Sequence, residues 1–266
     1  MSGCECQIRA RRRMLGVMLA GVLALGVPAA AIADLPATVV RIKPSIVAVG
    51  TFQRTRNPSF AFHGTGFAVG NGRLIATNAH VLPEKIATDK FETLAIATIS
   101  GNSGSVEVRP AKQVGLDKGR DLAVLAIEGN SIPVLSLAER GQVNEGQEVA
   151  FTGFPIGNAL GFFPVTHRGI ISAITPIGIP QSRARELDPA LIRRLANDPF
   201  RVYQLDATAY PGNSGSPLYD PVTGQVIGIV NMVFVKSTKE RVLSDPSGIS
   251  YAIPVEYLAA MIAGLP

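Results

Sequence analysis

A succession of short apolar segments, separated by turn residues, is the feature that most constrains the fold of this chain. Each segment is rich in β-branched residues and bounded by Gly, Pro, Asn or Asp, which is typical of β-strands. The clearest hairpin signal is Gly70-Asn71-Gly72, which has an apolar segment on each side. Twelve segments are expected as strands: 45–53, 64–69, 73–77, 93–99, 106–114, 122–127, 148–152, 169–174, 202–206, 217–219, 226–235 and 248–253. A dozen short strands with so little helix predict an all-β sandwich or barrel.

Two stretches have helical character instead. Residues 186–197 interrupt the strand pattern in the second half of the chain, and residues 255–263 follow the last expected strand. We expect a helix at each of these places.

The first 33 residues have the layout of a secretory signal peptide. Four arginines lie among the first thirteen residues, an uncharged apolar run follows over 14–27, and Ala31-Ile32-Ala33 offers a small-x-small cleavage site. The apolar run is shorter than the roughly 20 residues that span a membrane. We therefore expect export to the bacterial periplasm or medium with residues 1–33 removed. An uncleaved N-terminal anchor is the alternative.

Removal of this segment changes what the composition implies. Four of the 25 basic residues and one of the 20 acidic residues lie in it, so a net charge of +5 becomes +2. Such a balance gives no support for nucleic-acid binding. Both cysteines, Cys4 and Cys6, are removed as well, which excludes a disulfide or a cysteine nucleophile from the mature chain. The three histidines lack metal-ligand spacing, and neither a metal, a cofactor nor a membrane contact is expected.

Three polar segments carry the candidate chemistry. They contain His80 within 76–81, Asp121 within 119–125 and Ser214 within 210–217. Each alone is ordinary: a histidine at a strand end, an aspartate before an apolar strand, and a tight turn. Together they meet a chemical requirement, because a serine hydroxyl is a poor nucleophile at neutral pH. It needs a base within hydrogen-bond reach, and that base needs an acidic group to hold its tautomer.

The turn Gly212-Asn213-Ser214 is predicted to form an oxyanion hole. A tetrahedral oxyanion needs two backbone N–H groups directed at one point. Glycine at position 212 can adopt backbone angles that are closed to other residues and so turn its N–H inward. The N–H of Ser214 would be the second donor.

In these strings the chain resembles the trypsin-like serine peptidases. TNAHV, RDLAVL and GNSGSP occur in the order of that family, and the similarity is greatest to the protease domain of bacterial HtrA-type proteins. The resemblance covers 39–257 and includes the segments 64–67, 169–173 and 250–254. It implies two six-stranded antiparallel β-barrels with the active site in the cleft between them. The first barrel is then expected within 34–138, and the second within 139–266 with a C-terminal helix.

The resemblance also implies roles for the three residues. His80 would act as general base and then as general acid, Asp121 would orient it, and Ser214 would attack the scissile carbonyl. The expected protein is an exported serine endopeptidase that acts on polypeptides through an acyl-enzyme. One alternative is a peptidase-fold binding or regulatory protein with little or no proteolytic activity. Another is an esterase that uses the same site.

Several features depart from the family pattern. Asn213 stands where zymogen-activated members have an aspartate, so activation through a new N-terminal ammonium is not expected. Ser216 replaces a glycine common in HtrA-type proteins, and GNSGSP is also similar to glutamyl endopeptidases. Residues 54–63 are expected as a short connection in place of a long loop, and no PDZ domain is expected. HtrA-type relatives often form trimers, so the resemblance leaves a homotrimer open.

The resemblance assigns the walls of the specificity pocket to two segments. These comprise Thr208, Ala209, Tyr210, Pro211, Asn231, Met232 and Val233. None of them is acidic, so selection for Lys or Arg has no charge partner, and a small or medium apolar side chain is expected. The alternative is an acidic side chain recognised by His167 and Thr208. Residues 175–200 exceed the family core. We favour a solvated surface helix there over a loop that contacts substrate or a neighbouring subunit.

Overall fold

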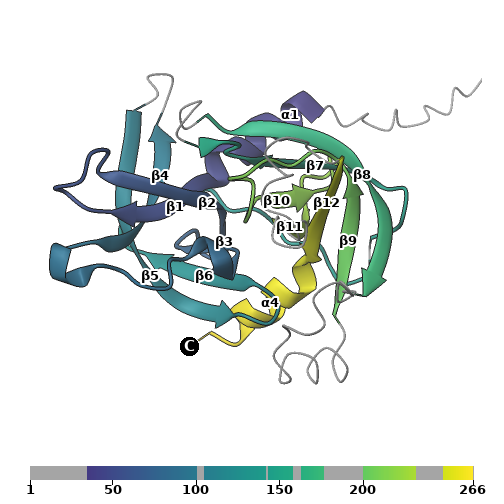
Figure 1. Ribbon diagram of the computed structural model, residues 1–266. Helices are drawn as coiled ribbons and strands as arrows, with labels where there is room; N and C mark the ends of the chain where they lie inside the picture. The colour runs from purple at the N-terminus through teal and green to yellow at the C-terminus, as the bar shows by residue number, and fades with distance from the viewer. Residues whose placement is uncertain are drawn as a thin grey trace, which may run out of the picture. The chain divides into compact units, whose positions relative to one another are not determined.

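Two closed antiparallel β-barrels form the described part of the protein (Figure 1). The computed structural model describes residues 35–100, 105–141, 143–157, 163–176, 200–231 and 248–265. All of them belong to one compact unit, Ala33–Pro266. The structure therefore confirms the predicted all-β fold of two six-stranded barrels.

The first barrel runs in the order β1-β2-β3-β6-β5-β4. Its strands are β1 (Ile46–Phe52), β2 (Phe60–Val69), β3 (Leu74–Thr77), β4 (Thr93–Ser100), β5 (Ser105–Asp117) and β6 (Leu122–Ile127). The second barrel runs in the order β10-β11-β12-β9-β8-β7. Its strands are β7 (Glu148–Gly153), β8 (Val165–Pro176), β9 (Arg201–Asp206), β10 (Pro217–Tyr219), β11 (Val226–Asn231) and β12 (Ile249–Pro254).

Helices are few among the described residues. The helix expected over 255–263 is present as α4 (Val255–Ala263), and 3₁₀ turns include η2 (Ala79–Val81) and η3 (Thr88–Lys90). A further helix, α1 (Leu35–Ile42), was not predicted. Its β-branched residues favour a strand, and burial of Thr38 and Ile42 outweighs that preference. The helix expected over 186–197 lies outside the described residues.

Every predicted strand is present, although some bounds differ. β6 and β10 begin and end where the sequence predicts, and the hairpin at 70–72 joins β2 to β3. The connection expected over 54–63 is shorter than predicted, because β2 already begins at Phe60. A bulge between Val49 and Gly50 shifts the register there. A Cβ at Gly50 would lie 1.9 Å from the Ala61 carbonyl oxygen. Only glycine at this position therefore allows β2 to pair with β1 back to Phe60. The predicted division between residues 138 and 139 stays a prediction.

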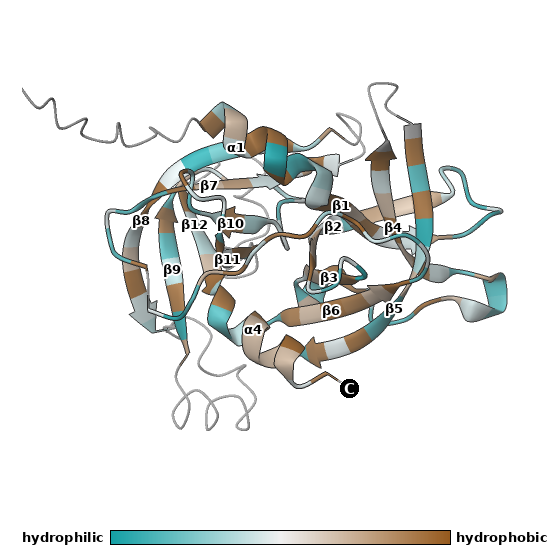
Figure 2. Cartoon of the chain, turned by 180° about the vertical axis from the view of Figure 1, so that it is seen from behind, coloured by the Kyte–Doolittle hydropathy of each residue, from teal (hydrophilic) through white to brown (hydrophobic). Residues whose placement is uncertain are grey.

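Apolar side chains of β1 are buried on both faces of the strand. Val47 and Val49 belong to a cluster confined to the first barrel. Ile46 and Ala48 belong to a second cluster that also includes Phe151 and other residues of the second barrel. Burial on both faces explains why β1 is a continuous apolar run, whereas β5 alternates apolar and polar residues (Figure 2). The two barrels thus share one continuous apolar core.

A partly buried carboxylate ties two loops of the first barrel together. Glu92, immediately before β4, accepts hydrogen bonds from the Thr51 hydroxyl at 2.7 Å, the Arg56 guanidinium at 2.7 Å and the Ala87 N–H at 3.0 Å. Its side chain is only 14% exposed. These donors, the Thr51 hydroxyl first, lower the pKa of Glu92 from 4.5 to about 2.

This network predicts a pH-dependent stability. A carboxyl whose pKa is depressed by folding stabilises the protein fully above pH 4.5, and the contribution is lost as the pH falls from 4.5 toward 2. We expect Glu92→Gln to lower the free energy of unfolding at pH 7 by about 1 to 3 kcal/mol. In urea titrations the gap between wild type and variant should narrow at pH 3. An equal gap at both pH values would contradict the assignment.

Candidate active site

The pairing of β3 with β6 brings His80 and Asp121 together. His80 lies in η2, just after β3, and Asp121 immediately precedes β6. Thr77 pairs with Ala123 in the register of the two strands. The chain ends that carry both residues therefore meet, and the Asp121 carbonyl accepts hydrogen bonds from the Ala79 N–H at 3.2 Å and the Asn78 amide at 3.0 Å.

Both oxygens of the Asp121 carboxylate contact His80. Oδ2 lies 2.6 Å from the ring Nδ1, and Oδ1 accepts the backbone N–H of the same residue at 2.8 Å. With an ionised carboxylate as its partner, Nδ1 carries the proton, and Nε2 of the neutral ring is left as an acceptor. This is the tautomer that a general base requires.

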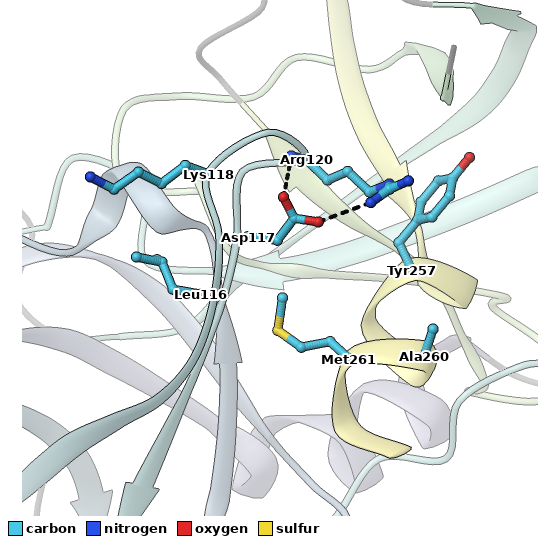
Figure 3. Close-up of a pocket in the computed structure, with 7 residues that line it drawn as sticks. All are labelled: Leu116, Asp117, Lys118, Arg120, Tyr257, Ala260 and Met261. Carbon is cyan, nitrogen blue, oxygen red and sulfur yellow. Dashed lines mark hydrogen bonds and ion pairs between the residues drawn. The ribbon is translucent and has the colours of Figure 1, made fainter. Parts of the chain in front are cut away.

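The carboxylate is also held from the second barrel. The Asn231 side chain, at the end of β11, donates to Asp121 Oδ2 at 2.7 Å. Asp121 adopts a left-handed backbone conformation, with φ of 56°, which is uncommon outside glycine. The preceding Arg120 pairs with Asp117 at 3.1 Å and lies 5.0 Å from the centre of the Tyr257 ring on α4 (Figure 3). Neighbours on both sides thus fix Asp121.

Ser214 lies in the turn before β10 and is 5% exposed. Its carbonyl accepts the Thr65 N–H of β2 at 2.9 Å. Gly64 lies between Ser214 and the η2 turn. A Cβ at Gly64 would lie 2.7 Å from the Val81 side chain and 3.0 Å from the Ser214 carbonyl oxygen. Among the described residues, the Ser214 hydroxyl makes no hydrogen bond to His80 or to any other group. Catalytic hydrogen bonds are often long before substrate binds and shorten in the complex.

The carbonyls of the turn before Ser214 are all occupied. The Pro211 carbonyl accepts the Ile156 N–H at 2.7 Å, the Gly212 carbonyl accepts the Thr65 hydroxyl at 2.7 Å, and the Asn213 carbonyl accepts the Ser216 N–H at 3.0 Å. A trans peptide unit points its N–H opposite its carbonyl. The N–H groups of Gly212 and Ser214 are thereby directed away from these partners. Neither has a partner within the described part of the chain.

The side chain of Asn213 lies behind this turn. Asn213 and Ser216 are fully buried, and their side-chain polar atoms have no hydrogen-bond partner among the described residues. Both approach Gly153, where a Cβ would lie 2.0 Å from Ser216 Oγ and 3.0 Å from Asn213 Oδ1. Asn213 therefore contributes backbone to the turn, and its amide is buried beside Gly153.

The residues expected to line the specificity pocket are partly described. Thr208 to Pro211 lead into the glycine turn, and Asn231, which we expected in the pocket wall, also donates to Asp121. His167 of β8 stacks on Phe151 at 4.9 Å, and its ring centre lies 6.0 Å from that of Tyr210. Burial lowers the pKa of His167, so the ring is uncharged at neutral pH. Met232, Val233 and most of the segment 175–200 lie outside the described residues.

Comparison with known proteins identifies the family of the chain. Residues 64–229 match the family described as the trypsin-like peptidase domain. The chain belongs to the trypsin-like peptidase family. It is 32% identical over 194 residues to a probable periplasmic serine endoprotease DegP-like protein of Halomonas elongata, which covers 73% of this chain and 33% of that protein. It is 28% identical over 197 residues to the putative serine protease HhoB of Synechocystis, covering 73% of this chain and 38% of that protein.

This trypsin-like peptidase domain spans about a third of the length of the DegP-like relatives that it matches. Within the described ranges, none of its helices is both long and apolar enough to cross a membrane.

Sequence reasoning missed two partners of the site, Asn231 on Asp121 and Thr65 on Gly212. Thr65 stands in the string 64–67, which carried the family resemblance, but nothing in that string indicates where its hydroxyl points.

The glycine after Ser214 provides a test of the packing around the site. Gly215 has φ of 87°, and a Cβ there would lie 2.0 Å from the Thr65 carbonyl oxygen. Gly146 has φ of 81°, with nothing within 4 Å of a Cβ. Both alanine variants incur the backbone cost, about 1 to 2 kcal/mol, but only Gly215→Ala adds a collision. In urea denaturation, the free energy of unfolding should fall about twice as much, or more, for Gly215→Ala as for Gly146→Ala. Equal losses in the two variants would contradict the described packing.

Proposed function

We propose that this chain is an exported serine endopeptidase that hydrolyses polypeptides through His80, Asp121 and Ser214. The observation that carries the proposal is the two-point contact of the Asp121 carboxylate with His80, 2.6 Å to Nδ1 and 2.8 Å to the backbone N–H. It supports a ring that is fixed in orientation and tautomer, with Nε2 ready to accept a proton. Membership of the trypsin-like peptidase family supports the same reaction.

The reaction follows from the chemistry of these groups. His80 Nε2 takes the Ser214 hydroxyl proton as Oγ attacks the scissile carbonyl, and Asp121 stabilises the resulting imidazolium. The negative charge of the tetrahedral intermediate falls on the carbonyl oxygen, where the N–H groups of Gly212 and Ser214 donate to it. His80 then gives its proton to the leaving amine, and the C–N bond breaks to leave an acyl-enzyme.

Deacylation repeats these steps with water as the nucleophile. His80 Nε2 takes a proton from the water, whose oxygen attacks the acyl carbon. The second tetrahedral intermediate collapses, Ser214 Oγ leaves, and His80 returns the proton to it. The enzyme ends in its initial state.

Localisation and domain limits are part of the proposal. The basic and apolar layout of residues 1–33 supports cleavage as a signal peptide, and the DegP-like relatives are named as probable periplasmic proteins. The proposed barrel domains are 34–138 and 139–266. The proposed partners are polypeptide substrates.

The proposed primary specificity is for a small or medium apolar side chain. The pocket segment 208–211 has no acidic residue, and the neighbouring His167 is uncharged at neutral pH. An uncharged imidazole offers a hydrogen bond but no ion pair to an acidic substrate side chain. The described part of the pocket therefore offers no charge partner for Lys and Arg or for Glu and Asp.

Cleavage of casein by wild type and Ser214→Ala tests the function, with a fluorophosphonate probe applied to both. Wild type should cut and label, and Ser214→Ala should do neither, with a loss of several orders of magnitude in turnover. Labelling without cleavage of casein or of a peptide library, but with hydrolysis of small esters, would favour the esterase. A folded wild type that neither cuts nor labels would favour the binding protein.

The Asn231 hydrogen bond predicts a graded effect on catalysis. Asn231→Ala removes a donor at 2.7 Å from the Asp121 carboxylate, and hydrogen bonds to charged groups are worth about 1.5 to 3 kcal/mol. We expect kcat/KM on a peptide substrate to fall roughly tenfold to a hundredfold. Asn144→Ala, an exposed position before β7, is the matched control and should leave kcat/KM unchanged. An Asn231→Ala enzyme with wild-type kcat/KM would show that Asp121 needs no support from β11.

A further inference from the structure

The hydroxyl of Thr65 joins the first barrel to the turn that precedes Ser214. Thr65 is fully buried in β2, and its Oγ1 donates to the Gly212 carbonyl at 2.7 Å, 147 residues away in the chain. The same oxygen accepts the Phe154 N–H at 3.0 Å. We propose that Thr65 is a positioning residue that holds the peptide unit joining the two oxyanion-hole donors, and through it the direction of their N–H groups; this inference rests on the proposed function.

Only a hydroxyl meets both demands at this position. A carbonyl needs a donor and an N–H needs an acceptor, and a hydroxyl is the smallest side-chain group that offers both. Space around it is limited: a Cβ at Gly153 would come 2.9 Å from Thr65 Oγ1 and 2.0 Å from Ser216 Oγ. The residue type is therefore set by hydrogen bonding and by volume together.

The backbone of Thr65 holds the other side of the same turn. Its N–H donates to the Ser214 carbonyl at 2.9 Å, and its own carbonyl accepts the Thr77 hydroxyl at 2.7 Å. Thr65 thus binds the carbonyls of both Gly212 and Ser214, the two residues whose N–H groups are the proposed oxyanion donors. Since Thr77 anchors Thr65 in turn, the pair of contacts is tied to the pairing of β2 with β3.

Gly212 is the point in the turn where such a constraint matters most. It has φ of 100°, and a Cβ there would lie 2.3 Å from the Phe154 carbonyl oxygen, so the position requires glycine. Glycine can reach backbone angles of both signs, and its peptide units are held only by their partners. The Ile156 N–H holds the Pro211 carbonyl, and Thr65 holds the Gly212 carbonyl. The Gly212 carbonyl shares its peptide unit with the Asn213 N–H, and this unit joins the two units that carry the Gly212 and Ser214 N–H groups. Without the Thr65 bond the unit keeps only the bond of the Asn213 N–H to the Tyr210 carbonyl at 3.0 Å, so it can tilt and turn a neighbouring N–H donor away from the site.

Replacement by valine and by serine separates this role from packing. Thr65→Val keeps the shape and removes the hydroxyl, whereas Thr65→Ser keeps the hydroxyl. For a peptide substrate we expect Thr65→Val to lower kcat about 10²- to 10³-fold, as for loss of one oxyanion donor, with KM little changed. Affinity for a peptidyl boronate, which occupies the oxyanion site as a tetrahedral adduct, should fall in parallel with kcat. Affinity for a product peptide should not change, and Thr65→Ser should restore kcat.

Thr152→Val is the control for loss of a buried hydroxyl. Thr152 is fully buried, and its hydroxyl bonds Thr166 and Tyr219, both residues of the second barrel and neither of them part of the glycine turn. The Thr152→Val variant should lower the urea midpoint about as much as Thr65→Val does, and it should leave kcat unchanged. If Thr65→Val does not fold, Thr65→Cys takes its place, because a thiol is a weak donor and a partial loss of kcat is expected.

Two results would overturn the inference. One is a folded Thr65→Val enzyme with wild-type kcat. The other is a loss of kcat matched by an equal loss of product-peptide affinity, or shared by Thr152→Val. Both results are measured relative to wild-type kcat, so the wild-type enzyme must be active. A wild type that neither cuts casein nor labels with a fluorophosphonate is a failure of the proposed function, which distinguishes the two cases.

Discussion

The carboxylate of Asp121 accepts hydrogen bonds from both barrels, from His80 of the first and from Asn231 of the second. A second pair of contacts crosses the same boundary, from Thr65 to the carbonyls of Gly212 and Ser214. The orientation of the histidine and the shape of the glycine turn therefore both depend on the packing of one barrel against the other. Neither barrel alone contains all residues of the proposed site.

That packing is apolar in origin. One continuous cluster of buried residues includes Ile46 and Phe67 of the first barrel with Phe151 and Leu205 of the second. Burial of apolar surface is favourable but non-directional, so it brings the barrels together without fixing their exact registration. The hydrogen bonds at Asp121 and Thr65 are directional and supply that registration at the edge of the core.

The local part of this architecture could be predicted from the sequence, because strands and turns leave periodic signals. All twelve strands follow from apolar runs and turn residues, and β6, β10 and α4 have the predicted bounds. The helix α1 was missed because its β-branched residues signal a strand. The early start of β2 was missed because an extra residue, His63, breaks the alternation of that strand where Val49 pairs with Gly64 and Gly50 with Phe62. Local pattern carries no information on either point.

The candidate site likewise has a part that local sequence indicates and a part that only the structure reveals. His80, Asp121 and Ser214 stand in short strings whose order indicates the chemistry, so they could be proposed before the structure. The bonds of Asn231 to Asp121 and of Thr65 to Gly212 join residues 110 and 147 positions apart, and no local string reports such a contact. Asn231 had been expected in the pocket wall, because the resemblance fixes its place in the chain but not its partner.

A crystal structure of the mature protein with a peptidyl boronate tests the central claim most directly. The account predicts a covalent bond from Ser214 Oγ to boron, with one boron oxygen about 2.7 to 3.1 Å from the N–H groups of both Gly212 and Ser214. It also predicts that the second hydroxyl of the adduct approaches His80 Nε2. A boronate bound elsewhere, or bound to Ser214 with its oxygen turned away from the glycine turn, would contradict it.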